Sequence, residues 1–141
     1  MNYKFEIPGE PVAKGRPRFS FKGKDVKTYT PKKTVSYENL VKLSFMQQVG
    51  NVEPIHKGVY VYIQAYLKIP DSTSKKKREQ MNEKEILPLK KPDCDNIAKG
   101  ILDALNGMAY DDDKQIVSLE VNKFYSDRPR AVVNISDSLF D

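Results

Sequence analysis

The chain has 141 residues, of which 39% are hydrophobic and 30% charged, and carries a net charge of +5; this fits one domain spanning 1–141 with its own core and excludes a disordered chain. It has neither an apolar run approaching the roughly 20 residues of a membrane helix nor an export signal behind Met1, so we expect a cytoplasmic protein without membrane association. Cys94 is the single cysteine, which excludes an intrachain disulfide.

The N-terminal third predicts a strand, a basic loop and a helix. Apolar and polar residues alternate over 2–7, which is typical of a strand, and Pro8-Gly9 ends it. Residues 11–18 form a turn-rich basic loop. Thr30-Pro31 is placed as the N-cap and first residue of a helix, whose apolar residues recur at helical spacing until Gly50 ends it.

The rest of the chain predicts three more strands and one more helix. Alternation marks a strand over 59–69, and the Lys/Glu-rich residues 70–91 predict a mobile surface segment with room for a helical turn. A second helix is expected over 95–105, followed by strands over 117–121 and 131–135. This order predicts an α+β fold with one mixed sheet and two helices packed on it.

The charge is unevenly distributed. Residues 1–33 carry nine Lys/Arg against three acids, and residues 75–91 carry seven against three. Residues 93–113 carry six aspartates against one lysine. Basic segments attract polyanions, whereas an acidic cluster repels them unless a cation is bound there. A metal site inside a nucleic-acid-binding surface reconciles the two, although a basic surface can also serve solubility alone.

Asp93 and Asp95 are the first candidate metal ligands. If the chain stays extended through both, their carboxylates leave the same side of it. Two close carboxylates repel each other, and a hard cation such as Mg²⁺ removes that penalty. Asp95 stands at the expected helix start and could instead cap the helix, which would leave Asp93 unexplained.

Lys99 follows Asp95 by one helical turn. The simpler interpretation is an ion pair between them of about 0.3 kcal/mol. The functional interpretation is a cation aimed at the scissile phosphate of a nucleic acid. Asp103 continues the same face of the helix, but residues in that position more often face solvent or end a helix.

A second acidic group, Asp111 to Asp113, precedes the strand that begins near Ile116. Such a run is usually a solvated loop. Here the chain must turn back after the helix, which can bring one of these aspartates close to Asp93 and Asp95. Three carboxylates and a lysine suit a phosphodiesterase with one or two metals. His56, the only histidine, is expected to be a surface residue.

In these residues the sequence resembles the RusA family of Holliday junction resolvases, which occurs in bacteria and their phages. The resemblance lies in residues 92–99, continues through 102–105, resumes at 112–117, and includes the loop 8–18. It implies a RusA-like α+β fold and a homodimer that binds four-way DNA junctions. It further implies paired, symmetric nicks that depend on Mg²⁺, or on Mn²⁺ in its place.

The resemblance also assigns roles to individual residues. Asp93 and Asp95 match the family's first two catalytic, metal-binding aspartates, and Lys99 matches its catalytic lysine. Asp113 matches the third catalytic, metal-binding aspartate. This chain has three consecutive aspartates where the family usually has two; residues 115–117 place the register on Asp113, and Asp112 is the alternative.

DNA contacts are expected from the basic segments, because phosphate contacts give strong, salt-dependent binding. The candidate residues are Lys14, Arg16 and Arg18, with Lys75, Lys76 and Lys77. Phe19 and Phe21 follow the first group and could wedge against bases at a junction centre, although packing in the core or on the surface is the simpler interpretation.

Our hypothesis is therefore a metal-dependent, structure-selective DNA endonuclease acting in recombination and repair. The main alternative is a DNA-binding accessory protein of a phage or bacterium that has no catalytic activity. A hydrolase of nucleotides or small phosphoesters is a third possibility, and the basic loops speak against it.

Overall fold

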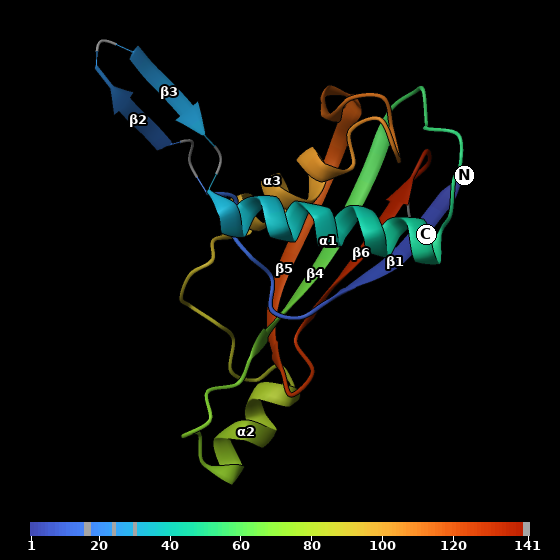
Figure 1. The fold of residues 1–141 in the computed structure, drawn as a ribbon. Helices are drawn as coiled ribbons and strands as arrows, with labels where there is room; N and C mark the ends of the chain where they lie inside the picture. Colours follow the sequence, from blue (N-terminus) through green and yellow to red (C-terminus); the bar gives the residue numbers. More distant parts are fainter. Residues whose placement is uncertain (16–17, 24, 30, 140–141) are drawn as a thin grey trace.

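The computed structural model describes residues 1–15, 18–23, 25–29 and 31–139 and confirms the α+β fold with a mixed sheet. The sheet has four strands in the order β1-β6-β4-β5, and a separate two-stranded sheet pairs β2 with β3 (Figure 1). The elements are β1 (Asn2–Pro8), β2 (Arg18–Lys22), β3 (Asp25–Tyr29), α1 (Lys32–Gln48), β4 (Val59–Lys68), α2 (Lys75–Asn82), α3 (Cys94–Ala104), the 3₁₀ turn η1 (Asp113–Gln115), β5 (Ile116–Ser126) and β6 (Arg130–Ser136).

Strand β4 organises the main sheet. Its residues alternate between buried and half-buried, as the alternating sequence predicts, and it pairs antiparallel with β6 and parallel with β5. A parallel pair needs a long crossover, because a tight turn can only join antiparallel strands. The chain between β4 and β5 makes this crossover through α2 and α3, which places α3 beside β5.

Helices α1 and α3 pack against each other and lie over the sheet (Figure 1). The core between helices and sheet is closely filled; Val41 and Phe45 of α1 and Ile97 and Ile101 of α3 are fully buried in it. Burial of side chains of this size contributes about 1.5–3 kcal/mol each, so the apolar faces of the two helices fix their positions. The carboxylates of α3 are therefore held on a rigid element.

Two elements differ from the sequence prediction. The expected basic loop ends at Arg18, and no element was predicted for the residues after it; Arg18–Lys22 and Asp25–Tyr29 form the β2–β3 hairpin, which extends away from the sheet and helices (Figure 1). The segment 70–91, expected to be mobile, contains the eight-residue helix α2. Pro31 is the N-cap of α1 rather than its first residue, and Thr30 lies outside the described residues.

Helix α2 has its own small core at the far end of β4 and β5. Leu67, Ile69 and Tyr125 are buried there against side chains from the α2 region. Arg78 of α2 forms an ion pair of 2.6 Å with Asp127 in the turn after β5. These contacts explain why a segment so rich in Lys and Glu is ordered. Among the described residues no helix has the length and apolar character needed to cross a membrane.

Candidate active site

The first turn of α3 presents Asp93 and Asp95 differently. Asp93 is the N-cap, with extended backbone, but its side chain makes no capping hydrogen bond. Cys94 already begins the helix, so Asp95 lies in the first turn. The expectation that an extended chain directs both carboxylates to the same side is therefore wrong. The alternative that Asp95 caps the helix is also wrong, and in the described part of the chain neither carboxylate has a hydrogen-bonding partner.

Two pockets flank the first turn of α3. One, which we call the acidic pocket, has a volume of about 260 Å³; its polar lining is Asp95, Lys99, Asp103 and Asp113, and its floor is apolar. The floor consists of Ala98, Leu102, Ile116 and Leu119. Helix α3 supplies the first two carboxylates, and η1, immediately before β5, supplies Asp113. Residues far apart in sequence thus meet because α3 packs beside β5.

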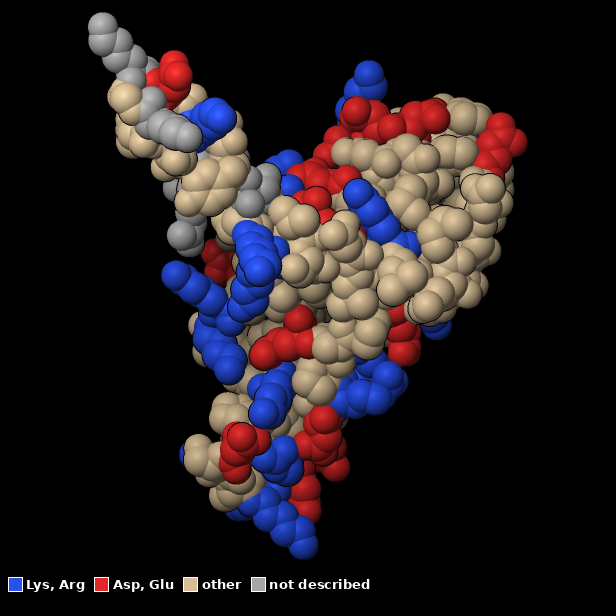
Figure 2. All heavy atoms as spheres, viewed as in Figure 1, with Lys and Arg blue, Asp and Glu red and all other residues tan. Residues whose placement is uncertain are grey.

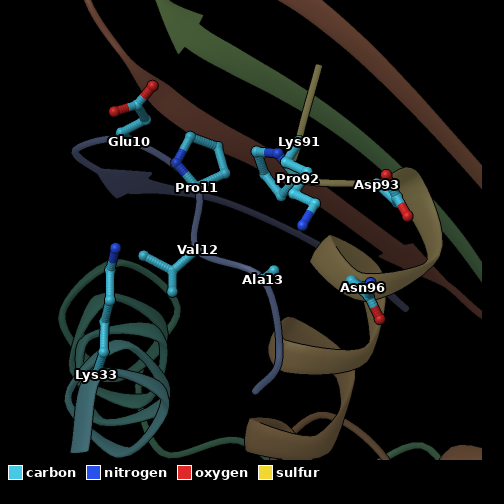
Figure 3. A pocket seen from close by; sticks show the side chains of 9 residues that line it. All are labelled: Glu10, Pro11, Val12, Ala13, Lys33, Lys91, Pro92, Asp93 and Asn96. Atoms are coloured by element: carbon cyan, nitrogen blue, oxygen red, sulfur yellow. The ribbon is translucent and has the colours of Figure 1, made fainter. Parts of the chain in front are cut away.

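Asp93 lines the second pocket, of about 460 Å³ (Figure 3). We call it the lysine pocket, because Lys33 of α1 and Lys91 approach it from two sides, with Asn96 of α3 at its edge (Figure 3). Residues 10–13 of the loop after β1 form the rest of its wall. Sequence reasoning did not single out either lysine, because nothing in their spacing connects them with the aspartate motif.

The three consecutive aspartates have three different environments. Asp111 Oδ2 lies 2.7 Å from Nδ1 of His56. Asp112 caps η1: its Oδ1 accepts a hydrogen bond of 2.9 Å from the Lys114 N–H. Asp113 alone of the three lines the acidic pocket. This supports the register on Asp113 and gives Asp112 a local structural task.

The loop that carries these aspartates is fixed at both ends. Before it, the buried Tyr110 hydroxyl donates a hydrogen bond of 2.5 Å to the Leu102 carbonyl of α3. After it, the Gln115 side-chain amide donates to the carbonyls of Ile55 at 2.7 Å and Lys57 at 3.0 Å. Its oxygen accepts from the backbone N–H at the start of η1. The chain was expected to return toward α3 because the spacing is short. The hydrogen bonds of Tyr110 and Gln115 hold it in that position.

The lysines around the acidic pocket share one carboxylate. Lys99 does not pair with Asp95; its Nζ lies 3.3 Å from Asp103 Oδ1, one turn further along α3. Lys14 Nζ lies 3.4 Å from the other oxygen of Asp103 and also pairs with Glu38 of α1. Partial burial acts to lower the pKa of Lys14, but the hydrogen bond and charge of Glu38 and the charge of Asp103 raise it overall. Lys14 therefore stays protonated beside the pocket.

Asp103 lines the acidic pocket, although the sequence predicted that it faces solvent or ends the helix. Its position eight residues after Asp95 and four after Lys99 placed it on the correct helix face. Its side chain is only 21% exposed and lies between two lysines, instead of facing solvent. Its pairing with Lys14, which is far away in the sequence, could not be read from spacing.

Electrostatic repulsion is concentrated on Asp113. Burial raises its pKa first, and the neighbouring carboxylates of Asp112 and Asp103 raise it further, while Lys99 partly counteracts them. The pKa of Asp112 is lowered, chiefly because the Lys114 backbone N–H stabilises its charged form. A carboxyl with a raised pKa that faces other carboxylates gains most from a bound cation.

The donor set of the acidic pocket fits a hard divalent cation. Asp95, Asp103 and Asp113 offer only carboxylate oxygens, which Mg²⁺ and Mn²⁺ prefer. Within the described residues, no three His, Cys, Asp or Glu side chains already converge as a ready-made metal site. The fit therefore rests on the chemistry of the donors and on the repulsion at Asp113.

The basic residues predicted to contact DNA lie in separate parts of the molecule. Lys14 forms ion pairs with Glu38 and Asp103 near the site. Arg16 lies outside the described residues, and Arg18 is the first residue of β2. Lys75, Lys76 and Lys77 are exposed in the first turn of α2. Figure 2 shows Lys and Arg side chains gathered along one edge, from the start of α1 down to α2.

Comparison with known proteins gives two findings. Residues 8–136 match the family described as Endodeoxyribonuclease RusA. The chain is also 42% identical, over 137 residues, to the protein named "Uncharacterized protein YqaN" of Bacillus subtilis (strain 168). That alignment covers 95% of each of the two chains. Both similarities include the acidic pocket and the loop that precedes the β2–β3 hairpin.

Proposed function

The chain belongs to the RusA endodeoxyribonuclease family, and on this premise we propose that it is a divalent-metal-dependent endonuclease that resolves four-way DNA junctions by paired, symmetric nicks. The observation that carries the proposal is the acidic pocket, where Asp95, Asp113 and Lys99 from two elements surround one hollow. Asp95 does not cap α3. Asp112 caps η1 and Asp111 contacts His56, so Asp113 is the aspartate of the run that faces the pocket.

In this proposal Asp95 and Asp113 hold Mg²⁺ or Mn²⁺ in the acidic pocket. Asp93, which lines the lysine pocket at the start of α3, would turn toward the bound ion as the third ligand. A bound ion would neutralise the scissile phosphate and lower the pKa of an attacking water. Asp103 holds the Lys99 amine beside the pocket at 3.3 Å. From there the ammonium can meet a phosphate oxygen and stabilise the negative charge that develops during cleavage.

The lysine pocket supports the same placement of DNA. Lys33 and Lys91 line this pocket together with Asp93 (Figure 3). We propose that a phosphate next to the scissile one lies here, so that the strand crosses the first turn of α3. Such contacts position the backbone and carry no information on base sequence.

We propose a homodimer as the active form, because a junction offers two equivalent strands and a two-fold dimer offers two equivalent sites. Recognition would rest on branched shape, with phosphate contacts from two basic segments. One contains Lys14, Arg16 and Arg18, and the other contains Lys75, Lys76 and Lys77. The role would be in DNA recombination and repair, in the cytoplasm of a bacterium or in a phage infection.

The test is cleavage of an end-labelled synthetic four-way junction beside a linear duplex of matched sequence. Wild type, Asp95→Asn and the control Asp111→Asn are each incubated with Mg²⁺ and with EDTA. The proposal expects paired nicks in the junction only, dependent on Mg²⁺, absent in Asp95→Asn and retained in Asp111→Asn. Tight junction binding without cutting under Mg²⁺ or Mn²⁺ would instead indicate a non-catalytic DNA-binding protein.

A further inference from the structure

The β2–β3 hairpin exposes large apolar and aromatic side chains that belong to neither hydrophobic cluster of the described residues. Phe19 is 64% exposed, Phe21 76%, Val26 54% and Tyr29 49%. The hairpin extends from the body of the molecule (Figure 1), and β2 and β3 form a sheet only with each other. A two-stranded hairpin without a packing partner is only marginally stable in water. An apolar surface of this kind therefore indicates a partner.

The strand register divides the hairpin into two faces. Phe21 lies opposite Val26, and Phe19 lies opposite Thr28, so both phenylalanines and the valine share one face. Lys27 lies opposite Ser20 on the other face. Alternation along each strand keeps the faces apart. One face of the arm thus carries Phe19, Phe21 and Val26, and the other carries Lys27 and Tyr29. None of these side chains belongs to the main core.

The charge of the arm identifies the chemistry of its partner. Residues 16–30 contain five Lys/Arg and a single acid, Asp25. Protein–protein interfaces are depleted in lysine at their centres, whereas basic groups beside exposed aromatic rings are typical of contacts with nucleic acid. Nucleic acid supplies both complementary surfaces, namely phosphates for the basic groups and flat base faces for the rings.

The arm is connected to the site by a docked loop. The Lys14 N–H donates a hydrogen bond of 3.1 Å to the Asn96 carbonyl of α3, and the Gly15 N–H donates one of 2.9 Å to Thr34 Oγ1 of α1. Asn96 immediately follows the catalytic candidate Asp95. A five-residue strand spans about 17 Å, so the tip of the arm lies about one and a half helix diameters from its base.

We propose that the β2–β3 hairpin is a junction-sensing arm whose face of Phe19, Phe21 and Val26 stacks on bases unstacked at the branch point. This inference rests on the proposed function and adds to it the element that distinguishes branched from linear DNA. Apolar side chains that enter a base step partially unstack it and bend the helix. At a branch point the bases are already unstacked, so the arm stacks there with less disruption than in an intact duplex.

The test uses the full chain and a four-way junction that carries 2-aminopurine at the branch point, in EDTA so that no strand is cut. The variant is Phe19→Ser/Phe21→Ser. The matched control is Leu43→Ser/Met46→Ser, two apolar residues of α1 that are 53% and 43% exposed. Fluorescence, junction and duplex affinity, melting temperature and sedimentation mass are measured for each protein.

The proposal expects the wild type and the control to lower 2-aminopurine fluorescence on binding, because stacking against an aromatic ring quenches it. The phenylalanine variant should leave the fluorescence unquenched and should bind the junction about 10-fold more weakly. Its affinity for the linear duplex should stay within about 2-fold, because phosphate contacts remain. Melting temperature and mass should not change.

Two outcomes would overturn this role of the arm while leaving the proposed endonuclease intact. In one, the phenylalanine variant keeps wild-type junction affinity and fluorescence. In the other, its sedimentation mass falls by half, which would make the arm a contact between two copies of the chain. A wild type that neither binds nor cuts the junction would remove both proposals together.

Discussion

Replacing Asp113 by asparagine separates the metal-binding function of the acidic pocket from the stability of the fold. In the metal-free protein, burial and then the charges of Asp112 and Asp103 raise the pKa of Asp113. A group with a raised pKa in the folded state contributes stability that is present below its ordinary pKa and is lost as the pH rises through the raised value. Metal-free Asp113→Asn should therefore melt above wild type at about pH 7, and at the same temperature at about pH 3.

Divalent metal should reverse this order. An ion present at 100 times its Kd stabilises the folded state by about 2.7 kcal/mol. In a domain of this size, 1 kcal/mol corresponds to about 3 °C, so Mg²⁺ should raise the wild-type melting temperature by about 8 °C. Loss of an outer-shell partner already weakens metal affinity by up to about 100-fold, and Asp113→Asn removes a proposed ligand itself. At the same Mg²⁺ concentration the variant then keeps about 0.4 kcal/mol, or about 1 °C.

The assay is calorimetric melting at both pH values, with Mg²⁺ and with EDTA, combined with junction cleavage. Asp111→Asn is the matched control, because Asp111 pairs with His56 outside the acidic pocket. It should keep the Mg²⁺-dependent shift of wild type and cut within about 3-fold of it. A Mg²⁺ shift that survives in Asp113→Asn but disappears in Asp111→Asn would refute the register argued from the structure.

Three further predictions concern the scaffold of the site. Tyr110→Phe removes a buried hydrogen bond and should cost about 1–2 kcal/mol in urea unfolding. Lys99→Ala should lower the cleavage rate more than about 100-fold; the side chain is 61% exposed, so the melting temperature should stay at the wild-type value. Gly15→Ala places a Cβ 2.8 Å from Thr34 Oγ1 and should lower the melting temperature. In Gly100→Ala the new Cβ has no neighbour closer than 3.6 Å, so this variant should raise the free energy of unfolding by about 0.5–1 kcal/mol. A lower stability of Gly100→Ala would contradict the open space around Gly100.

Periodicity predicted the main elements because their packing is regular. The alternation over 59–69 gave β4, and helical spacing of apolar residues gave α1 and α3, whose buried faces follow that spacing. The β2–β3 hairpin was missed, although Phe19 and Phe21 alternate with polar residues and Gly23 follows. The segment was interpreted from its basic composition. Its aromatic residues are exposed, so the usual link between an alternating pattern and a buried face does not apply to them.

The arrangement of the site was only partly readable. The short return from α3 to β5 predicted that an aspartate of the run 111–113 comes back to the helix. Which of the three does so depends on η1, where Asp112 is used as a cap and Asp113 turns to the pocket. The separation of Asp93 from Asp95 depends on the helix beginning one residue earlier than expected, at Cys94. One residue of helix changes a carboxylate's direction by about 100°.

The ion pairs around Asp103 decide how the carboxylates of the acidic pocket divide their tasks. Asp103 already has two cationic partners, Lys14 at 3.4 Å and Lys99 at 3.3 Å, so a metal ion would compete there with charges that the fold supplies. Asp113 has a raised pKa and carboxylate neighbours, so a cation relieves an existing repulsion. We therefore infer that Asp113, with Asp95, binds the ion and that Asp103 positions Lys99. The Asp103 carboxylate, 3.3 Å from Lys99, would offset the repulsion between that lysine and a bound ion.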